Sequence, residues 1–450
     1  MRKLNLLLAS YLFYAAWNPP FVVLLWISTV VDWYAARGIA RTRSVRARRG
    51  WLVLSLLVNL GLLGYFKYGG FLLANFLAGA SALGFDLQLA APSIVLPVGI
   101  SFYTFQTLSY TIDIYQGHSK PGRSFLDYAL YVTFFPQLVA GPIVRAREFL
   151  YQCVEPKRVS GRQLAWGMML LSVGLFNKMV VADLFMAPVV EDVFNAQAAP
   201  SFLTAWVGTL AFAVQIFCDF AGYSSCAIGV ALMLGFSLPT NFRFPYAAIG
   251  FSDFWRRWHI SLSAWLRDYL YIPLGGNRKG KARTHVNLLL TMLLGGLWHG
   301  ASWRFVVWGG LHGLYLILEK WLSTRAFAAW GIWRKPFGRT LLGGLTFVGV
   351  CFTWPFFRAH SFGKAWQVVS GMLLPFRGLA HPEVALYDVA AVLSITAAVL
   401  AVHWFMHDRT LEAVVSSLRW WVLVPLLAAM LYAVFCSFAG EDRAFIYFQF

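Results

Sequence analysis

Long apolar stretches without Asp, Glu, Lys or Arg recur along the whole chain. Most reach the about 20 residues that an α-helix needs to cross a hydrocarbon core about 30 Å thick. The stretches are Leu4–Val31, Gly50–Phe66, Leu87–Ile112, Tyr128–Val144, Val193–Cys218, Phe220–Phe242, Thr340–Phe357, Val389–Met406 and Trp420–Gly440. The pattern therefore predicts an all-α integral membrane protein.

Some of these stretches are longer than one crossing and contain Pro or Gly. Examples are Asn18–Pro20 and Pro97–Gly99. Such sequences predict either two helices or one broken, re-entrant helix, which is tolerated at membrane depth only where protein or a water-filled cavity covers it. Counting them in this way, we expect about ten to thirteen membrane segments.

The segment 251–270 has a different pattern, that of an amphipathic helix. Its polar arc predicts an exposed face formed by Asp253, Arg256, Arg257, Arg267 and Asp268. The opposite arc is aromatic and aliphatic, with only Ile260 out of place, and His259 lies at its edge. We predict a helix that lies in the membrane interface with its aromatic face inward. Pro273 and the turn Gly275–Asn277 end it.

Composition agrees with this class and changes how the charge is interpreted. Of 450 residues, 59% are hydrophobic and 12% are charged, against roughly 25% charged in soluble domains. The net charge of +18 lies mainly in short loops, such as Arg37–Arg49 and Arg278–Arg283. Excess Lys and Arg in short loops is typical of the cytoplasmic side of a membrane protein and excludes nucleic acid as the preferred partner. The side of the N-terminus stays open, and the first apolar run is expected to be an uncleaved segment.

We expect one polytopic domain over residues 1–450, with a catalytic core at approximately 90–320. No internal repeat, linker or low-complexity tract stands out. The five Cys lack a CxxC pair and are expected to pack in the core, with no metal site.

His299 is the first candidate for chemistry. It lies in the apolar run Val286–Trp303, within the sequence GGLWHGASW and next to Trp298. An ionisable side chain inside a membrane segment is costly and usually faces a cavity or a partner. A neutral imidazole can act as a general base near neutral pH. The alternative is a His bonded to a carbonyl of a neighbouring helix.

His259 is the second candidate, with a solvated interfacial His as its alternative. His312 and His403 lie in apolar runs and are expected to be core residues. Asp219 interrupts another apolar run and needs a partner, such as an Arg from another helix; it either orients a catalytic His or forms a structural ion pair. Asp113 is interpreted in the same way.

Basic residues of the loop 278–283, including Arg278 and Lys279, are candidates for contacting the phosphates of a cytoplasmic donor. The alternative role is topology-setting charge. Walker A, GxSxG, HExxH and Cys/His metal-binding patterns are absent from the sequence.

Several motifs together resemble the membrane-bound O-acyltransferases, most closely the bacterial alginate O-acetyltransferase branch. They run through essentially the whole chain: GISFYTFQTLSYTIDIYQG (99–117), FFPQLVAGPIVR (134–145), CDFAGYSSCAIG (218–229), FWRRWHISLSAWLRDYLYIPLGGNRKG (254–280), GGLWHGASW (295–303) and FIYFQF (445–450).

The resemblance implies a ring of membrane helices around a tunnel, located in the bacterial inner membrane. It assigns the essential histidine to His299 and a second characteristic histidine to His259. It also implies acyl transfer from a cytoplasmic thioester, with acetyl-coenzyme A as the expected donor and no tightly bound cofactor. The acceptor would be an extracytoplasmic polysaccharide, reached directly or through a periplasmic partner protein. The candidate substrate-binding residues are Trp298, Asp219, Arg256, Arg257, Arg278 and Lys279.

This chain departs from the family pattern at Ser225 and Cys226, where relatives often have Asp and Met, so acidic chemistry is not expected there. Three alternatives stay open. They are D-alanyl transfer from a carrier protein to teichoic acid, a transporter or flippase of glycan or lipid, and an inactive assembly scaffold. The sequence does not identify the polymer.

Overall fold

The computed structural model describes residues 2–90, 94–154, 157–374, 384–437, 443 and 445, and within these residues it is helical with no strand. Seven helical stretches are long and apolar enough to cross a membrane. They are Pro19–Arg41, Val45–Ala82, Gly161–Asn195, Phe202–Met233, Pro336–Arg358, Leu386–Phe405 and Trp420–Ser437. Further apolar helices accompany them, so the predicted all-α membrane class is confirmed. Of the C-terminal motif 445–450, all but Phe445 lies outside the described residues.

The chain divides into two compact units. The first comprises Met1–Gly167 and Val230–Pro239, and the second comprises Met168–Gly229 and Thr240–Phe450. The expectation of a single catalytic domain stays a prediction.

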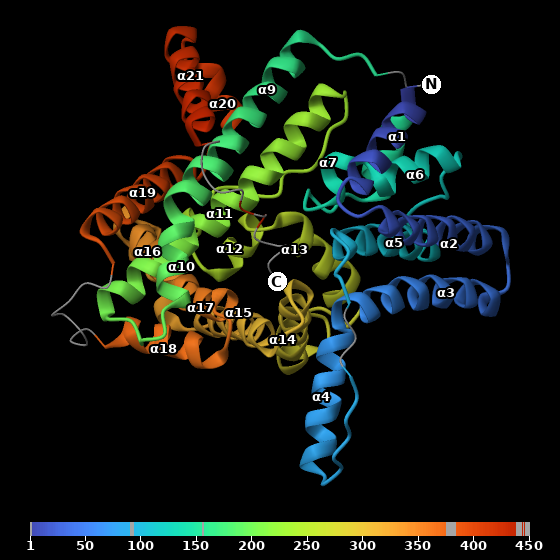
Figure 1. The fold of residues 1–450 in the computed structure, drawn as a ribbon, viewed down its shortest axis with the longest axis horizontal. Coiled ribbons are helices and arrows are strands. Elements are labelled where there is room, and N and C mark those ends of the chain that lie inside the picture. The colour runs from blue at the N-terminus through green and yellow to red at the C-terminus, as the bar shows by residue number, and fades with distance from the viewer. Residues whose placement is uncertain are drawn as a thin grey trace. The chain divides into compact units, whose positions relative to one another are not determined.

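The first unit contains α1 to α8 and the start of α9, and all of these except α8 are labelled in Figure 1. Their bounds are α1 Arg2–Ala15, α2 Val22–Arg41, α3 Val45–Leu63, α4 Gly69–Ala82, α5 Ile100–Tyr115, α6 Phe125–Thr133, α7 Phe135–Leu138, α8 Ala146–Phe149 and α9 Gly161–Leu175. The expected break at Pro97–Gly99 is present. Gly99 has a φ of 74°, and a Cβ there would lie 2.6 Å from the carbonyl oxygen of Leu138. Only glycine fits this start of α5.

Helices α2, α3 and α5 pack around a fully buried carboxylate, that of Asp32. Ser55 donates a hydrogen bond to it, as do the side-chain amide of Asn59 at 2.8 Å and the hydroxyl of Thr111 at 3.3 Å. Polar side chains that bond across helices hold such segments together where lipid provides no hydrophobic drive. Asp113 is also buried, on α5.

The second unit contains the rest of α9, most of α11 and the remaining helices. Their bounds are α10 Ala187–Asn195, α11 Phe202–Met233, α12 Phe251–Arg257, α13 Ile260–Leu266, α14 Gly280–His299, α15 Trp303–Leu322, α16 Pro336–Cys351, α17 Trp354–Arg358, α18 Phe362–Leu373, α19 Leu386–Phe405, α20 Leu411–Ser417 and α21 Trp420–Ser437. A π-helix, Phe176–Met186, joins α9 to α10, and another, Arg267–Tyr271, follows α13.

Helices α14 and α15 pack through small residues. A Cβ added at Gly296 would lie 2.1 Å from the carbonyl oxygen of Phe305, and one at Gly309 would lie 2.1 Å from that of Met292. Glycine at these positions lets the two backbones touch, as is typical of helix pairs in membranes. The contact fixes the C-terminal end of α14, where His299 lies.

The prediction of one continuous helix over 251–270 is wrong. Trp258 is extended and His259 is left-handed, with a φ of 43°, so the segment forms α12 and α13 with a break between them. Backbone hydrogen bonds hold this break. The N–H of Arg243 donates to the carbonyl of Arg257, and the N–H of Ile260 donates to the carbonyl of Asn241, both at 2.9 Å. The break turns Arg257, predicted on the exposed arc, into a buried residue.

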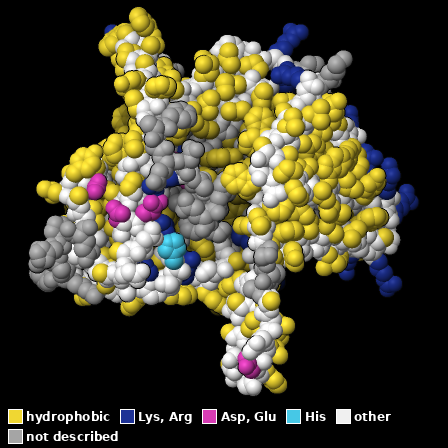
Figure 2. Space-filling view, in the orientation of Figure 1, with side chains coloured by type: hydrophobic (Ala, Val, Ile, Leu, Met, Phe, Trp, Pro, Cys, Tyr) yellow, Lys and Arg dark blue, Asp and Glu magenta, His cyan; other side chains and the backbone are white. Residues whose placement is uncertain are grey.

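Hydrophobic side chains cover most of the visible surface in Figure 2, whereas Lys and Arg gather at the ends of α2 and α3, around the loop Arg37–Arg49. Exposed apolar side chains such as Leu57 and Trp420 are 68% and 76% accessible. Continuous apolar surface of this kind marks a membrane-facing exterior.

Candidate active site

The second unit brings the two candidate histidines together. His299 is the last residue of α14, and His259 occupies the break between α12 and α13. Both are buried, at 4% and 0% exposure, and their ring centroids lie 6.3 Å apart. The solvated interfacial alternative for His259 is therefore wrong, because its ring is in the core of the unit.

Aromatic side chains surround His299. The rings of Trp298, Trp308 and Phe357 have centroids 5.1, 5.1 and 5.3 Å from its imidazole, each close to edge-on. The next residue, Gly300, leaves room for this arrangement, since a Cβ there would lie 2.1 Å from the ring of Phe305. We call Trp298, Trp308, Phe305 and Phe357 the aromatic cluster. Trp298 also lies 5.8 Å from His259, so it contacts both histidines.

A polar anchor, which the sequence analysis missed, holds the ring of His259. The side-chain oxygen of Asn241 lies 3.1 Å from Nδ1 of His259 and also accepts hydrogen bonds from the backbone N–H and the hydroxyl of Ser261, at 3.3 and 2.9 Å. The amide nitrogen of Asn241 donates to the hydroxyl of Ser224 at 3.3 Å. The signal available in the sequence was Asn241 itself, a polar amide in NFRFPY just before the amphipathic segment.

These hydrogen bonds determine the tautomer of His259. A backbone N–H can only donate, so the atom of Asn241 that it meets is the oxygen, and the same oxygen requires a proton on Nδ1 of His259. Nε2 therefore carries the lone pair. Burial lowers the pKa of His259 to about 3, so the ring is neutral at physiological pH.

The backbone of His259 is itself unusual. A non-glycine residue with a positive φ is strained by an energy of order 1–3 kcal/mol, and such residues cluster at functional sites. The ring of Phe220, from α11, packs edge-on against the imidazole at 4.7 Å. Backbone, amide and aromatic contacts together fix the position of this ring.

Asp219 forms a buried ion pair. Its carboxylate lies 2.7 Å from Nζ of Lys178, which also binds Asp183 at 2.9 Å. The expected arginine partner was wrong, because the π-helix Phe176–Met186 places a lysine opposite α11. Asp219 lies next to the site, since its neighbour Phe220 contacts His259.

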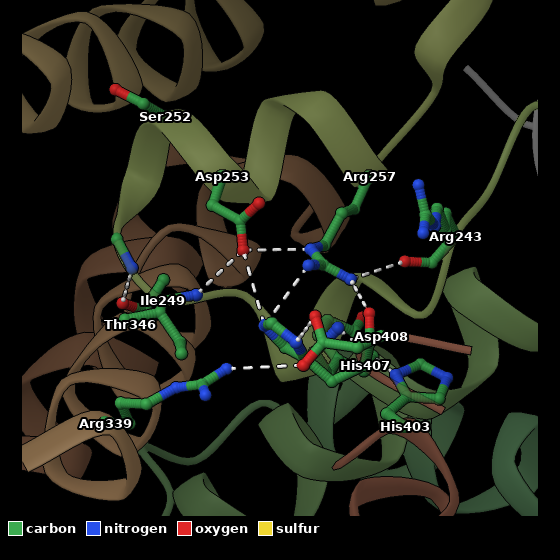
Figure 3. A network of polar contacts seen from close by, with 12 residues as sticks. Arg243, Ile249, Ser252, Asp253, Arg257, Arg339, Thr346, His403, His407 and Asp408 are labelled. Carbon is green, nitrogen blue, oxygen red and sulfur yellow. Dashed lines mark hydrogen bonds and ion pairs between the residues drawn. The ribbon is translucent and has the colours of Figure 1, made fainter. Parts of the chain in front are cut away.

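The predicted substrate-binding arginines and lysine lie in three different settings. Arg257 is committed to internal contacts: it binds Asp253 at 2.9 Å and the carbonyl of His407 at 2.9 Å, in the network drawn in Figure 3. Arg256 is exposed on α12. Arg278 and Lys279 are exposed directly before α14, at the end opposite His299.

His312 and His403 are core residues, as expected. Cys153, Cys218 and Cys351 are buried as well, but Cys226 is half-buried and Cys436 is exposed, so the expected core packing is wrong for Cys436. Nε2 of His312 lies 3.1 Å from the hydroxyl of Thr353, and Nδ1 of His403 accepts the backbone N–H of Tyr246 at 3.1 Å. All five cysteines are free. Across the described part of the chain, no group of three or more His, Cys, Asp or Glu side chains could hold a metal ion. Cys226, at the position where the chain departs from the family pattern, lies 3.7 Å from the carbonyl of Leu171.

Fold and site define an integral membrane protein with a buried pair of histidines. The sequence pattern of the membrane-bound O-acyltransferase family matches residues 121–332. The chain is 41% identical to a probable alginate O-acetylase of Pseudomonas syringae over 374 residues, which is 82% of this chain and 70% of that protein. It is 39% identical to a peptidoglycan O-acetyltransferase of Helicobacter pylori over 399 residues, 82% of this chain and 73% of the relative.

A teichoic acid D-alanyltransferase of Streptococcus thermophilus is 30% identical over 242 residues, 51% of this chain and 58% of that protein. The chain belongs to the membrane-bound O-acyltransferase family and is an O-acyltransferase.

Proposed function

We propose that this enzyme moves an acetyl group from a cytoplasmic thioester, acetyl-coenzyme A, to hydroxyls of an exported polysaccharide such as alginate, directly or through a periplasmic partner protein. We place it in the bacterial inner membrane. The observation that carries the proposal is the pair His299 and His259, which are buried with their rings 6.3 Å apart and share a contact with Trp298. The acetylating relatives match over 82% of the chain, whereas the D-alanylating relative matches over 51%.

In this mechanism His299 acts as the general base. It removes the proton of the acceptor hydroxyl while the oxygen attacks the thioester carbonyl, and the tetrahedral intermediate then expels the thiolate, which takes the proton from the imidazolium. General-base help of this kind contributes roughly 10²–10⁴-fold in rate. A transient acetyl group on His299 is the alternative route, in which the imidazole attacks the thioester first and the hydroxyl attacks second.

The developing oxyanion needs a hydrogen-bond donor, and the tautomer of His259 excludes this residue from that role. Since Nδ1–H of His259 is committed to Asn241, its Nε2 accepts rather than donates. The indole N–H of Trp298, whose ring contacts both imidazoles, is then the donor we propose. His259 would instead accept a hydrogen bond at Nε2 and so orient the acceptor hydroxyl.

The donor would enter at the other end of α14. This helix has 20 residues and is therefore about 30 Å long. Arg278 and Lys279 at its start are exposed and would attract the phosphates of coenzyme A at entry. The arm between the diphosphate and the thioester is shorter than this helix, so the donor would move past these residues before its acetyl end meets His299, the last residue of α14.

The test measures acetyl ester formation by the full chain reconstituted in lipid vesicles. Radiolabelled acetyl-coenzyme A is supplied on one side and glycan on the other, for the wild type, His299→Ala and His285→Ala. His285 lies on the same helix, partly exposed and away from the site, so it is the matched control. We expect a loss of about 10²-fold or more for His299→Ala only. Normal turnover of a folded His299→Ala protein would refute the mechanism, and transfer from a D-alanyl carrier protein alone would refute the choice of donor.

A further inference from the structure

Three rings of the second unit contact one another beside the site, and only one of them belongs to the aromatic cluster. They are Trp255 on α12, and Trp308 and His312 on α15. The centroid of His312 lies 5.1 Å from that of Trp255 and 4.8 Å from that of Trp308, and the two indoles lie 5.8 Å apart. Each pair meets at a steep angle, between 66° and 81°. We call Trp255, Trp308 and His312 the ring trio.

Each ring of the trio carries one nitrogen that is buried without a hydrogen-bond partner in the described part of the chain. These atoms are Nε1 of Trp255, Nε1 of Trp308 and Nδ1 of His312. Most buried side-chain polar atoms in proteins have a partner, and leaving one without a partner is destabilising. Three such atoms in contacting rings indicate that a bound group completes them.

The state of the third nitrogen follows from a contact with Thr353. The hydroxyl of Thr353 lies 3.1 Å from Nε2 of His312 and donates its own proton to the carbonyl of Val350 at 2.7 Å. Because this hydroxyl has a single proton, it accepts from His312, and Nε2 carries the hydrogen. A fully buried imidazole with no ion pair among the described residues is neutral, since a buried charge without a partner is costly. Nδ1 of His312 therefore carries a lone pair.

The ring trio thus presents two N–H donors and one acceptor, because an indole nitrogen can only donate. An anion would accept from the indoles but would be repelled by the lone pair of His312. A cation would be repelled by both indole N–H groups. A neutral O–H group fits all three, since its oxygen has two lone pairs for the indoles and its proton can be donated to Nδ1. Water and alcohol hydroxyls share this chemistry.

Trp308 connects the trio to the reacting position. Its ring lies 5.1 Å from His299 as well as 4.8 Å from His312. It also stacks on Trp354, with centroids 6.1 Å apart and planes 22° apart. Stacking fixes the plane of an indole but leaves it free to turn within that plane, whereas a hydrogen bond at Nε1 fixes both. A group bound in the trio would therefore determine the surface against which His299 packs.

We propose that the ring trio binds one neutral O–H group, a water molecule or an alcohol hydroxyl of a substrate, and that His312 acts through it as a positioning residue for His299. A buried water typically forms about three hydrogen bonds to otherwise unpaired groups, which is the number that the trio offers. The positioning role rests on the proposed function, because it takes His299 as the reacting side chain. The O–H site itself does not depend on that function.

The first experiment detects the bound group by NMR of the full chain in detergent, with ¹⁵N-labelled Trp and His. Trp255→Phe, Trp308→Phe and His312→Phe assign the signals. Spectra are recorded without substrate, then with coenzyme A, then with an alginate tetrasaccharide. We expect magnetisation transfer between both indole N–H protons and one O–H group, and a proton on Nε2 of His312. Transfer from water without substrate identifies a resident water, and transfer that requires one of the two ligands identifies a hydroxyl of that ligand.

Two matched variants test the acceptor. His312→Phe keeps a ring but removes Nδ1, so the transfer to the remaining indoles should be lost. His403→Phe makes the same change at a second buried histidine, which contacts Phe217 and Tyr246 rather than the trio, and it should leave the transfer intact. The proposal is overturned if His312 carries its proton on Nδ1, if neither indole receives transfer in any of the three conditions, or if His312→Phe leaves the transfer unchanged.

The positioning role is measured by acetyl transfer in vesicles. His312→Phe should lower kcat by about 10-fold or more with KM for acetyl-coenzyme A unchanged, because a small displacement of a reacting group slows the chemical step. It should also shift the ¹⁵N signals of His299, whereas folded His403→Phe should not. If His299→Ala transfers normally, the mechanism fails and the O–H site stands. If His299→Ala abolishes transfer but His312→Phe changes neither kcat nor the signals of His299, the mechanism stands and the positioning role is refuted.

Discussion

Replacing Asn241 with Ala should disturb both the stability and the chemistry of the site. The side-chain oxygen of Asn241 is fully buried and accepts hydrogen bonds from Nδ1 of His259 and from the N–H and hydroxyl of Ser261. The hydroxyl can rotate to another acceptor, but the backbone N–H and the imidazole N–H cannot. A buried donor left without an acceptor costs about 1–3 kcal/mol, so two of them destabilise the fold by about 2–6 kcal/mol.

The chemical effect follows from the tautomer. Without the amide oxygen, the proton of His259 is no longer held on Nδ1, and the lone pair is no longer held at Nε2. We expect turnover to fall by about 10-fold or more among molecules that remain folded, because the wrong tautomer presents a donor where an acceptor is needed.

Two measurements check this prediction: denaturation of the purified protein in detergent, and ¹⁵N NMR of labelled histidine, which distinguishes Nδ1–H from Nε2–H. Ser224→Ala is the matched control. It removes only the hydroxyl that accepts the amide N–H of Asn241 at 3.3 Å, and it should cost about 1 kcal/mol without changing the tautomer. An Asn241→Ala protein with an unchanged tautomer and a loss of stability below about 0.5 kcal/mol would refute the reasoning.

Three further predictions follow from the same unit. Gly296→Ala should lower the thermal stability, because its Cβ would lie 2.1 Å from a carbonyl of α15, whereas Gly344→Ala, with open space around it, should not; equal melting temperatures would contradict this. Lys178→Ala should destabilise the unit by about 3–5 kcal/mol, since it leaves the buried carboxylate of Asp219 without this cation. Asp219→Asn should cost less, and denaturation of both variants measures the difference. Finally, the pKa of His259 is lowered to about 3 from an ordinary value near 6.5, so the unfolded chain binds its proton first as pH falls. The contribution of neutral His259 to the free energy of unfolding is complete above about pH 6.5 and is lost progressively toward pH 3. His259→Gln should therefore flatten the plot of this free energy against pH over that range, which denaturation at several pH values measures.

The membrane class and the two histidines could be predicted from the sequence because they depend on local composition. A stretch such as Leu386–Phe405 needs a length and an absence of charge to cross a bilayer, and both are properties of the sequence alone. His299 stood out for the same reason, as an ionisable side chain within an apolar run. The motifs around His299 and His259 carried the family resemblance, which the comparison with relatives confirmed.

Tertiary structure decided what depends on contacts between distant segments. The periodicity of 251–270 predicted a continuous helix, but the carbonyl and N–H groups of residues 241 and 243 pair with those of 257 and 260 and hold His259 in a left-handed conformation. A helical wheel considers one segment alone and cannot show that another part of the backbone bonds to it. It therefore placed Arg257 on the exposed face, whereas the structure buries this residue. The amide that fixes the tautomer of His259, and the lysine that neutralises Asp219, likewise come from other segments of the chain. Hydrogen bonds and ion pairs depend on distances in space, and only the folded chain defines those distances.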